Sequence, residues 1–230
     1  VPEVKGEDPV EALSDPKTRL NEQKGAIPGA GRIGRNTLVT LSSAGITGVS
    51  AEEHTRNSIL APLKRQETFA TSGTRIRVRM FAGWNYPPNM LSKSRWVAAA
   101  YREGIPMGSD LPAKPKDAIA PVFLLQASKD PDGANLDRVQ IIKVWLEGAE
   151  YKEKVFDVAL SGGRKDDLKT GRAPLVGNTV DLKTGQYTNT IGAATLSAEW
   201  KDPEFDAAKP AVYYARVLEI PTPRWSTLLA

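Results

Sequence analysis

Short hydrophobic runs separated by turns dominate the second half of the chain. From Pro121 onward, turn sequences such as Asp-Pro-Asp-Gly, Glu-Gly-Ala-Glu and Lys-Thr-Gly separate runs of about five to ten residues. This spacing predicts antiparallel strands packed as a β-sandwich. The expected strands are residues 122–127, 138–146, 151–160, 178–182, 186–191 and 211–220. The second and third of these are expected to form a hairpin.

Hydrophobic and charged side chains alternate strictly over residues 74–81. Successive side chains of a strand point to opposite faces, so this pattern predicts a half-buried strand. Its inner face would hold Ile76, Val78 and Met80, and its outer face Arg75, Arg77 and Arg79. The three arginines suit a phosphate, sulfate or nucleic-acid backbone, but charge on an exposed strand also prevents edge pairing. Charge protection of the strand is the commoner explanation.

A strand followed by a helix is predicted just upstream. Residues 45–49 have the pattern of a short buried strand, and Ser50 with Glu53 three residues later matches a capping box. We therefore predict a helix over residues 51–65, with its inner face formed by Ile59, Leu60 and Leu63. Pro62 is expected to kink this helix or end it early, because proline has no N–H to donate.

These elements predict a mixed, mainly β fold in four segments. Residues 1–44 form a polar lead-in rich in proline and glycine, and residues 45–83 a strand–helix–strand segment. A loop-rich connector over residues 84–120 follows, in which residues 95–103 form a helix or a strand. Residues 121–230 form the antiparallel β domain. The expected architecture is a β-sandwich-like C-terminal region preceded by a short α/β segment.

Composition removes several kinds of chemistry. The 230 residues include one histidine and no cysteine, which excludes a catalytic thiol, a disulfide and any metal site built from several histidines of this chain. The net charge of +4 comes from interspersed positive and negative side chains, so nucleic-acid binding is not expected. No apolar stretch approaches the roughly 20 residues that span a bilayer, and the first residues lack the order of a signal peptide.

One cluster of reactive side chains stands out. Glu52, Glu53, His54 and Arg56 follow directly after the predicted strand at residues 45–49. In a β/α barrel, residues just past the C-terminal end of a strand line the active site. The competing explanation is structural, because acidic residues at a helix N-terminus stabilise the helix dipole. His54 has no Ser or Asp partner at motif spacing, so a catalytic triad is unsupported.

Two other motifs resemble binding sites without meeting their requirements. The glycines of residues 29–34 fit the dinucleotide-binding pattern, but no buried strand precedes them, so a flexible loop is the better interpretation. Residues 130–137 have the oxygen density of a calcium loop, but Ala134 occupies a position where the EF-hand needs Asp or Asn. A β-turn held by Asx hydrogen bonds is expected instead.

Six motifs together resemble a known family. They are AEEHTR (51–56), ETFATSGTRI (67–76), FAGW (81–84), GIPMGSDL (104–111), KDPDGANLD (129–137) and RVLEIPTPRW (216–225). In this order they look like the C-terminal part of a bacterial family catalogued as domain of unknown function 3604, and the resemblance runs from about residue 45 to the end. The family usually has Asn at the position of His54, which weakens any role for this histidine.

The resemblance implies a longer, often exported protein whose N-terminal half looks like a PHP-type metal-dependent hydrolase barrel. Residues 45–49 and 51–65 would then be the last barrel strand and its helix. The His-x-His and Asp-x-His elements that bind metal in that half have no match in this sequence. A divalent metal is therefore expected in the N-terminal half and none on this chain alone. The resemblance also implies a periplasmic or secreted location, while the residues themselves suit the cytoplasm equally well.

Two functions remain open at this point. In the first, the chain is the C-terminal portion of a phosphate or sulfate ester hydrolase, with Glu52 and Glu53 as catalytic residues and Arg56 and Arg75 as substrate-binding residues. Its partner would be the N-terminal half of the same protein or a second copy, with no nucleic acid and no membrane insertion. In the second, the chain is a non-catalytic β-rich module for a partner chain or glycan. Its expected contacts are Trp84, Trp96 and Tyr101.

Overall fold

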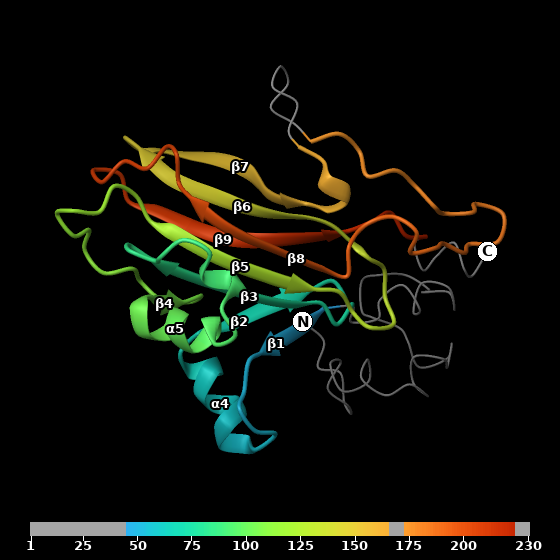
Figure 1. Cartoon of the computed structure of the whole chain (residues 1–230), viewed down its shortest axis with the longest axis horizontal. Coiled ribbons are helices and arrows are strands. Elements are labelled where there is room, and N and C mark those ends of the chain that lie inside the picture. The colour runs from blue at the N-terminus through green and yellow to red at the C-terminus, as the bar shows by residue number, and fades with distance from the viewer. Residues whose placement is uncertain (1–44, 166–172, 224–230) are drawn as a thin grey trace, which may run out of the picture. The chain divides into compact units, whose positions relative to one another are not determined.

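The computed structural model of the chain describes residues 45–165 and 173–223 (Figure 1). All strand pairs of this part are antiparallel, in sheets of two, four and three strands. The elements in chain order are β1 (Ile46–Val49), α4 (Arg56–Lys64), β2 (Thr68–Thr71), β3 (Arg77–Gly83), η1 (Met90–Ser92), α5 (Trp96–Glu103), β4 (Ile105–Pro106), β5 (Val122–Ser128), β6 (Leu136–Glu147), β7 (Glu150–Leu160), η2 (Ser161–Gly163), β8 (Thr195–Lys201) and β9 (Ala211–Glu219).

The two larger sheets pack face to face around the main core. One sheet has the order β4-β3-β5-β8 and the other the order β7-β6-β9. Between them lie the fully or nearly fully buried side chains of Phe123, Leu125, Leu136, Val139 and Ile141. This arrangement confirms the predicted mainly β fold with a sandwich-like antiparallel region.

The pairing of β6 with β7 confirms the predicted hairpin, in a register that places Leu146 opposite Tyr151. The strands predicted at residues 178–182 and 186–191 are wrong, because this stretch contains a single bridge between Asp181 and Gln186. Leu182 there is 81% exposed, so no core holds the segment in a sheet. Instead, β8 follows at Thr195–Lys201 and pairs with β5 along its whole length.

The strand β3 begins at Arg77, three residues later than predicted. Met80 faces the main core together with Val78, as the alternation predicted. Phe81, on the opposite face, is covered by α5 and packs edge-on against Trp96 with ring centroids 5.8 Å apart. The ambiguous segment at residues 95–103 is therefore a helix. The strands β3 and β5 pair directly, so the first sheet contains strands from the predicted segments 45–83 and 121–230. The division of the chain into four segments stays a prediction.

The helix α4 begins five residues later than predicted. Thr55 is its N-cap residue, and the Thr55 hydroxyl accepts a hydrogen bond from the backbone N–H of Ser58 (3.3 Å). The predicted capping box of Ser50 and Glu53 is thus wrong. Pro62 is fully buried inside the helix, which ends two residues after it. Leu63, predicted to face inward, is 41% exposed, because the buried proline occupies the face turned to the protein.

The position of this cap gives a direct prediction. Thr55→Ala removes the acceptor at the true N-cap and should destabilise α4 by about 1 kcal/mol. Amide hydrogen exchange of the α4 backbone measures this loss locally. Ser50→Ala is the matched control, since Ser50 precedes the helix by six residues and its loss should leave exchange unchanged. Equal effects of the two substitutions would contradict the cap assignment.

The strand β1 lies where it was predicted, but it is exposed at its start and half-buried at its end. Within the described residues β1 pairs only with β2, and the pairing is antiparallel. A strand of a β/α barrel has parallel neighbours, and no described strand is a parallel neighbour of β1. The interpretation of this segment as the end of a barrel therefore stays a prediction. The buried carboxylate of Glu67, just before β2, accepts hydrogen bonds from Tyr101 on α5 and from Arg65 (3.1 Å). This contact fastens the β1–α4–β2 segment to the sandwich.

No helix in the described part of the chain is long and apolar enough to cross a membrane.

Candidate functional site

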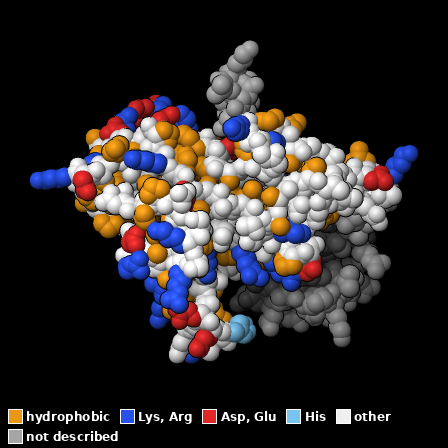
Figure 2. Space-filling view, viewed as in Figure 1, with side chains coloured by type: hydrophobic (Ala, Val, Ile, Leu, Met, Phe, Trp, Pro, Cys, Tyr) orange, Lys and Arg blue, Asp and Glu red, His pale blue; other side chains and the backbone are white. Residues whose placement is uncertain are grey.

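The predicted cluster lies on the surface, in the connection between β1 and α4. Glu52, Glu53 and His54 occupy bends after β1, and Arg56 is the first helical residue. All four side chains are exposed. Figure 2 shows the single histidine, in pale blue, at the surface near α4, beside acidic side chains. The cluster is therefore open to a substrate or to another protein surface.

Among the described residues, the cluster has no structural role of its own. None of the ion pairs there involves Glu52, Glu53 or Arg56. Only the backbone N–H of Glu53 is held, by the Ser58 hydroxyl (3.1 Å). The first turn of α4 contains no acidic residue, so the capping and dipole explanation for the two carboxylates does not apply as predicted.

Arg75 does not join this cluster. The register of the β1–β2 pair places Val49 opposite Thr68 at one end and Ile46 opposite Thr71 at the other. Glu52 and Glu53 follow the first end, whereas Arg75 follows the second, and a ladder of this length separates its ends by about 10 Å. A role of Arg75 in binding substrate stays a prediction, but within this structure it is not part of the same site.

Instead, Arg75 holds the turn after β5. Its backbone N–H and its guanidinium donate hydrogen bonds to the Asp130 carboxylate (2.7, 3.3 and 3.2 Å), and the guanidinium also pairs with Asp132. The backbone hydrogen bond from Arg75 is the main cause that holds the pKa of Asp130 below its usual value. Within the turn, the Asp130 carboxylate also accepts from the backbone N–H of Asp132 (3.1 Å). This confirms the predicted Asx turn at residues 130–133.

No group of three or more His, Asp and Glu side chains in the described part of the chain is arranged to hold a metal ion.

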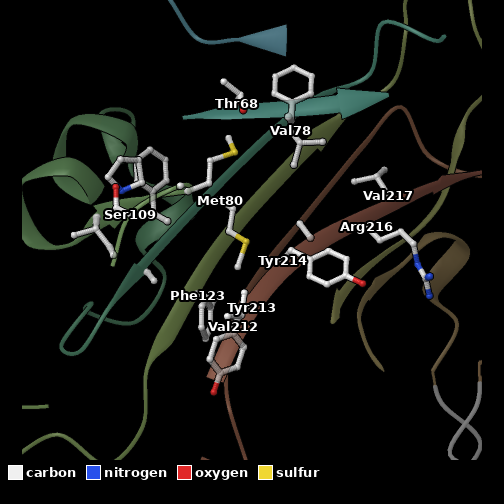
Figure 3. A pocket seen from close by; sticks show the side chains of 18 of the residues that line it. Thr68, Val78, Met80, Ser109, Phe123, Val212, Tyr213, Tyr214, Arg216 and Val217 are labelled. Atoms are coloured by element: carbon white, nitrogen blue, oxygen red, sulfur yellow. The ribbon is translucent and has the colours of Figure 1, made fainter. Parts of the chain in front are cut away.

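A second candidate site is a cleft of about 1200 Å³ between β3 and β9. Its floor is apolar and comes mainly from Val78, Met80 and Phe123. Figure 3 shows these side chains facing Tyr213 and Val217 of β9 across the cleft. The polar rim includes Thr68, Thr71, Ser109, Asp110 and Lys114. We refer to this cleft as the β3–β9 groove.

Within residues 45–165 and 173–223, the second sheet has one strand fewer than the first, and this difference leaves the groove open. At the closed side of the sandwich, Phe156 of β7 packs on Trp200 of β8, with ring centroids 4.9 Å apart. Towards the middle, Tyr213 of β9 packs on Phe123 of β5 at 4.7 Å. The next strand of the first sheet is β3, and no described strand of the second sheet lies over it. The groove is the space that such a strand would fill.

Both walls of the groove suit an extended chain. All nine residues of β9 line it, as expected when the free edge of a strand forms one wall. Within the described residues β9 pairs only with β6, so one row of its backbone N–H and C=O groups is available. The opposite wall consists of β2 and residues 107–111. The groove is therefore bounded on one side by a free strand edge and on the other by the segment that carries β2.

The ring of Tyr213 lines the groove, whereas its hydroxyl forms a hydrogen bond with a buried residue. The hydroxyl donates a hydrogen bond to the buried carboxylate of Asp202 (2.6 Å). Burial is the largest cause that raises the pKa of Tyr213 above its usual value, and the nearby Asp202 acts in the same direction. The raised pKa and the hydrogen bond both favour the protonated phenol, which acts here as a donor to Asp202.

Comparison with known proteins identifies the family. The family model described as Protein of unknown function (DUF3604) matches residues 10–230. The chain belongs to this family. No curated protein and no solved structure matches it. The match covers both candidate sites of the DUF3604 chain. It does not test whether a hydrolase-like N-terminal half exists, as the resemblance implies.

The structure also places the aromatic side chains predicted as contacts of this DUF3604 chain. Trp84 borders the groove and donates a hydrogen bond to the carbonyl oxygen of Pro112 (2.9 Å). Trp96 is buried in the smaller core beside α5, and the hydroxyl of the partly exposed Tyr101 is engaged with Glu67. Only Trp84 of the three is thus placed to contact a ligand in the groove. The glycine motif at residues 29–34 lies outside the described residues.

Proposed function

We propose that this DUF3604 chain is the C-terminal portion of a metal-dependent hydrolase of phosphate or sulfate esters, in which Glu52, Glu53 and Arg56 face the substrate. The main support is the exposure of these three side chains at the C-terminal end of β1, without an ion pair among the described residues. The two carboxylates and the guanidinium lie close together in sequence between β1 and α4, and none of them forms an ion pair among the described residues. Together they suit a surface that binds a charged substrate.

The chemistry of these groups fits ester hydrolysis. A carboxylate of Glu52 or Glu53 would take the proton of the attacking water or return a proton to the leaving oxygen. The planar guanidinium of Arg56 would bind two oxygens of a phosphoryl or sulfuryl group and stabilise the charge that develops on them. The divalent metal implied by the resemblance does not fit the described residues, which form no ligand group, so we assign no step to it.

This proposal is tested by Glu53→Gln and Arg56→Ala in a protein that contains this chain and hydrolyses p-nitrophenyl phosphate or sulfate. The loss of a general acid or base should lower kcat by about 10²- to 10⁴-fold. Lys64→Ala, an exposed cation on the same helix α4, is the control and should leave kcat and KM unchanged. Unchanged turnover in both test variants would exclude the assignment.

The groove favours a second candidate, a non-catalytic binding module for an extended polypeptide. A strand in the groove would pair with the free edge of β9 and place alternate side chains on the apolar floor, as in β-strand addition. The support for this candidate is the combination of an edge of β9 that pairs with no other strand among the described residues and an apolar floor beside it.

A nine-residue peptide that alternates Val and Lys is a suitable probe for the groove. We expect it to bind and to slow amide hydrogen exchange in β9, whereas the same peptide with its central valines replaced by Asp should not bind. Val78→Asp, which places a charge on the floor, should abolish binding, and Leu182→Asp on an exposed turn should not. Binding that survives Val78→Asp, or no binding at millimolar peptide, would exclude this candidate.

A further inference from the structure

The outer face of the β7-β6-β9 sheet is unusually apolar for a surface exposed to water. Residues opposite one another in neighbouring strands share a face, and the register places Val155 and Tyr214 on either side of Ile142. Six large hydrophobic side chains on this face are exposed: Leu146, Tyr151, Val155, Val212, Tyr214 and Leu218. Among them Tyr151 is 80% exposed and Val212 67%. We call this surface the outer sheet face.

The charged side chains at one end of the outer sheet face are already satisfied within the chain. The Asp157 carboxylate accepts hydrogen bonds from Gln140 (2.7 Å) and Arg138 (3.0 Å), and the Arg216 guanidinium donates one to Gln140 (2.8 Å). Covering this end would therefore bury a hydrogen-bonded network, which avoids the cost of leaving polar groups unpaired.

The distribution of charge across the face is asymmetric. The acidic residues Glu153 and Asp157 lie on β7 at one side, Arg216 lies on β9 at the other, and the central strand β6 separates them. A twofold axis parallel to β6 would place β7 of one copy over β9 of the other. Asp157 would then face the partner's Arg216, and Val155 would face the partner's Tyr214. On the axis itself, Arg138 of β6 would lie opposite the partner's Arg138, but each is already paired with Asp137 and Asp157 of its own chain. Away from the axis the face is complementary to itself in hydrophobicity and, through Asp157 and Arg216, in charge.

The size of the face is also adequate. The 12 residues of β6 span about 40 Å, and three strands with their side chains are about 15 Å wide, which gives about 600 Å² of projected area. Accessible surface exceeds projected area, and stable interfaces bury about 800 Å² on each partner. One sheet face of this chain is therefore of the size that a stable dimer needs.

We propose that two copies of the chain pack through their outer sheet faces, sheet on sheet, about a twofold axis along β6. Aligned packing of two twisted sheets, at about 30° to each other, is a common arrangement. The contact avoids the exposed cluster near α4 and the floor of the β3–β9 groove, so it is independent of the proposed hydrolase site. Four residues of β9 belong both to the outer sheet face and to the wall of the groove: Val212, Tyr214, Arg216 and Leu218. The dimer would therefore share the strand β9 with a ligand in the groove.

Sedimentation equilibrium of the 230-residue chain from micromolar to several hundred micromolar tests the dimer. We expect a dimer whose dissociation constant rises at least 100-fold in Val155→Glu, with Tyr214→Glu as a second variant should the first not fold. Leu182→Glu, equally exposed but on a turn away from this sheet, is the control and should associate like the wild type. A monomer at all concentrations, or a dimer that neither variant weakens, would overturn the proposal.

Cysteine cross-linking tests the axis, since the chain contains no cysteine. Val144 lies on the outer face of the central strand β6, so on this axis it faces the same residue of the second copy. Sheets packed face to face lie about 10 Å apart, too far for a direct disulfide, so a bismaleimide that spans about this distance should join two copies of Val144→Cys. Val155→Cys should be joined much less, because its two copies are also offset sideways by two strand spacings, about 9.6 Å. Linking of Val155→Cys that equals or exceeds that of Val144→Cys would overturn this axis.

Discussion

Lys143→Met lowers the free energy of unfolding by about 3–5 kcal/mol, because it leaves a buried charge without its partner. The Lys143 ammonium on β6 pairs with the Asp202 carboxylate at 2.7 Å, and the two side chains are only 7% and 0% exposed. The ammonium also donates to the carbonyl oxygen of Glu204 (2.6 Å). Urea denaturation, with the midpoint and slope read separately, measures the loss.

Lys154→Met is the matched control for this effect. Lys154 on the neighbouring strand β7 pairs with Glu204, but both side chains are nearly half exposed, so its loss should change stability by less than about 1 kcal/mol. In the double variant Lys143→Met with Asp202→Asn, part of the lost stability should return, because no uncompensated charge stays buried. The amide of Asn can still form hydrogen bonds with the Tyr213 hydroxyl and the backbone N–H of Glu204, which the Asp202 carboxylate binds in the wild type. Equal effects of Lys143→Met and Lys154→Met would show that the pair does not act as a buried one.

Phe81→Ala should also lower the free energy of unfolding by about 3–5 kcal/mol, in this case because it leaves a cavity in the core. Phe81 is 1% exposed and fills the space between β3 and α5. Its ring contacts Tyr101 edge-on, with centroids 4.8 Å apart, and Tyr101 in turn holds Glu67. Loss of the Phe81 ring should therefore also weaken the attachment of the β1–α4–β2 segment to the sandwich. Faster amide hydrogen exchange in β2 would detect this effect.

Ile119→Ala provides the contrast for the cavity effect. Ile119 is a similarly large hydrophobic residue, but it is 76% exposed, so its truncation should change stability by less than about 0.5 kcal/mol. If Phe81→Ala destabilised the protein no more than Ile119→Ala, α5 would not be packed on β3 as described.

The sequence predicted the elements whose pattern is set by local burial. The alternation from Ile76 to Met80 placed the inner face of β3 correctly, and the turn between β6 and β7 identified that hairpin. These features depend on which side of a single strand is buried, and the order of side chains records that directly. The same alternation is present in β8, where Leu196 and Ala198 are buried, so this strand also has a local sequence signal.

Other features depend on competition or on long-range topology. Ser50 and Thr55 both have the side chain that an N-cap needs, and only the backbone path after β1 decides that Thr55 is used. The groove could not be predicted, because no local pattern indicates that none of the described strands of the second sheet lies opposite β3. Of the predicted site residues, Glu52, Glu53 and Arg56 do lie together in one connection, whereas Arg75 lies at the far end of the β1–β2 ladder.

The strand β2 belongs to both candidate sites. Residues Thr68 to Thr71 form one wall of the groove and, on their paired edge, hold β1, which leads directly into Glu52 and Glu53. A ligand that displaces this wall therefore also displaces the strand on which the carboxylates depend. If both proposed sites bind ligands, such a displacement would couple them energetically. By linkage, a ligand at the carboxylates would then change the affinity of the groove by the same factor.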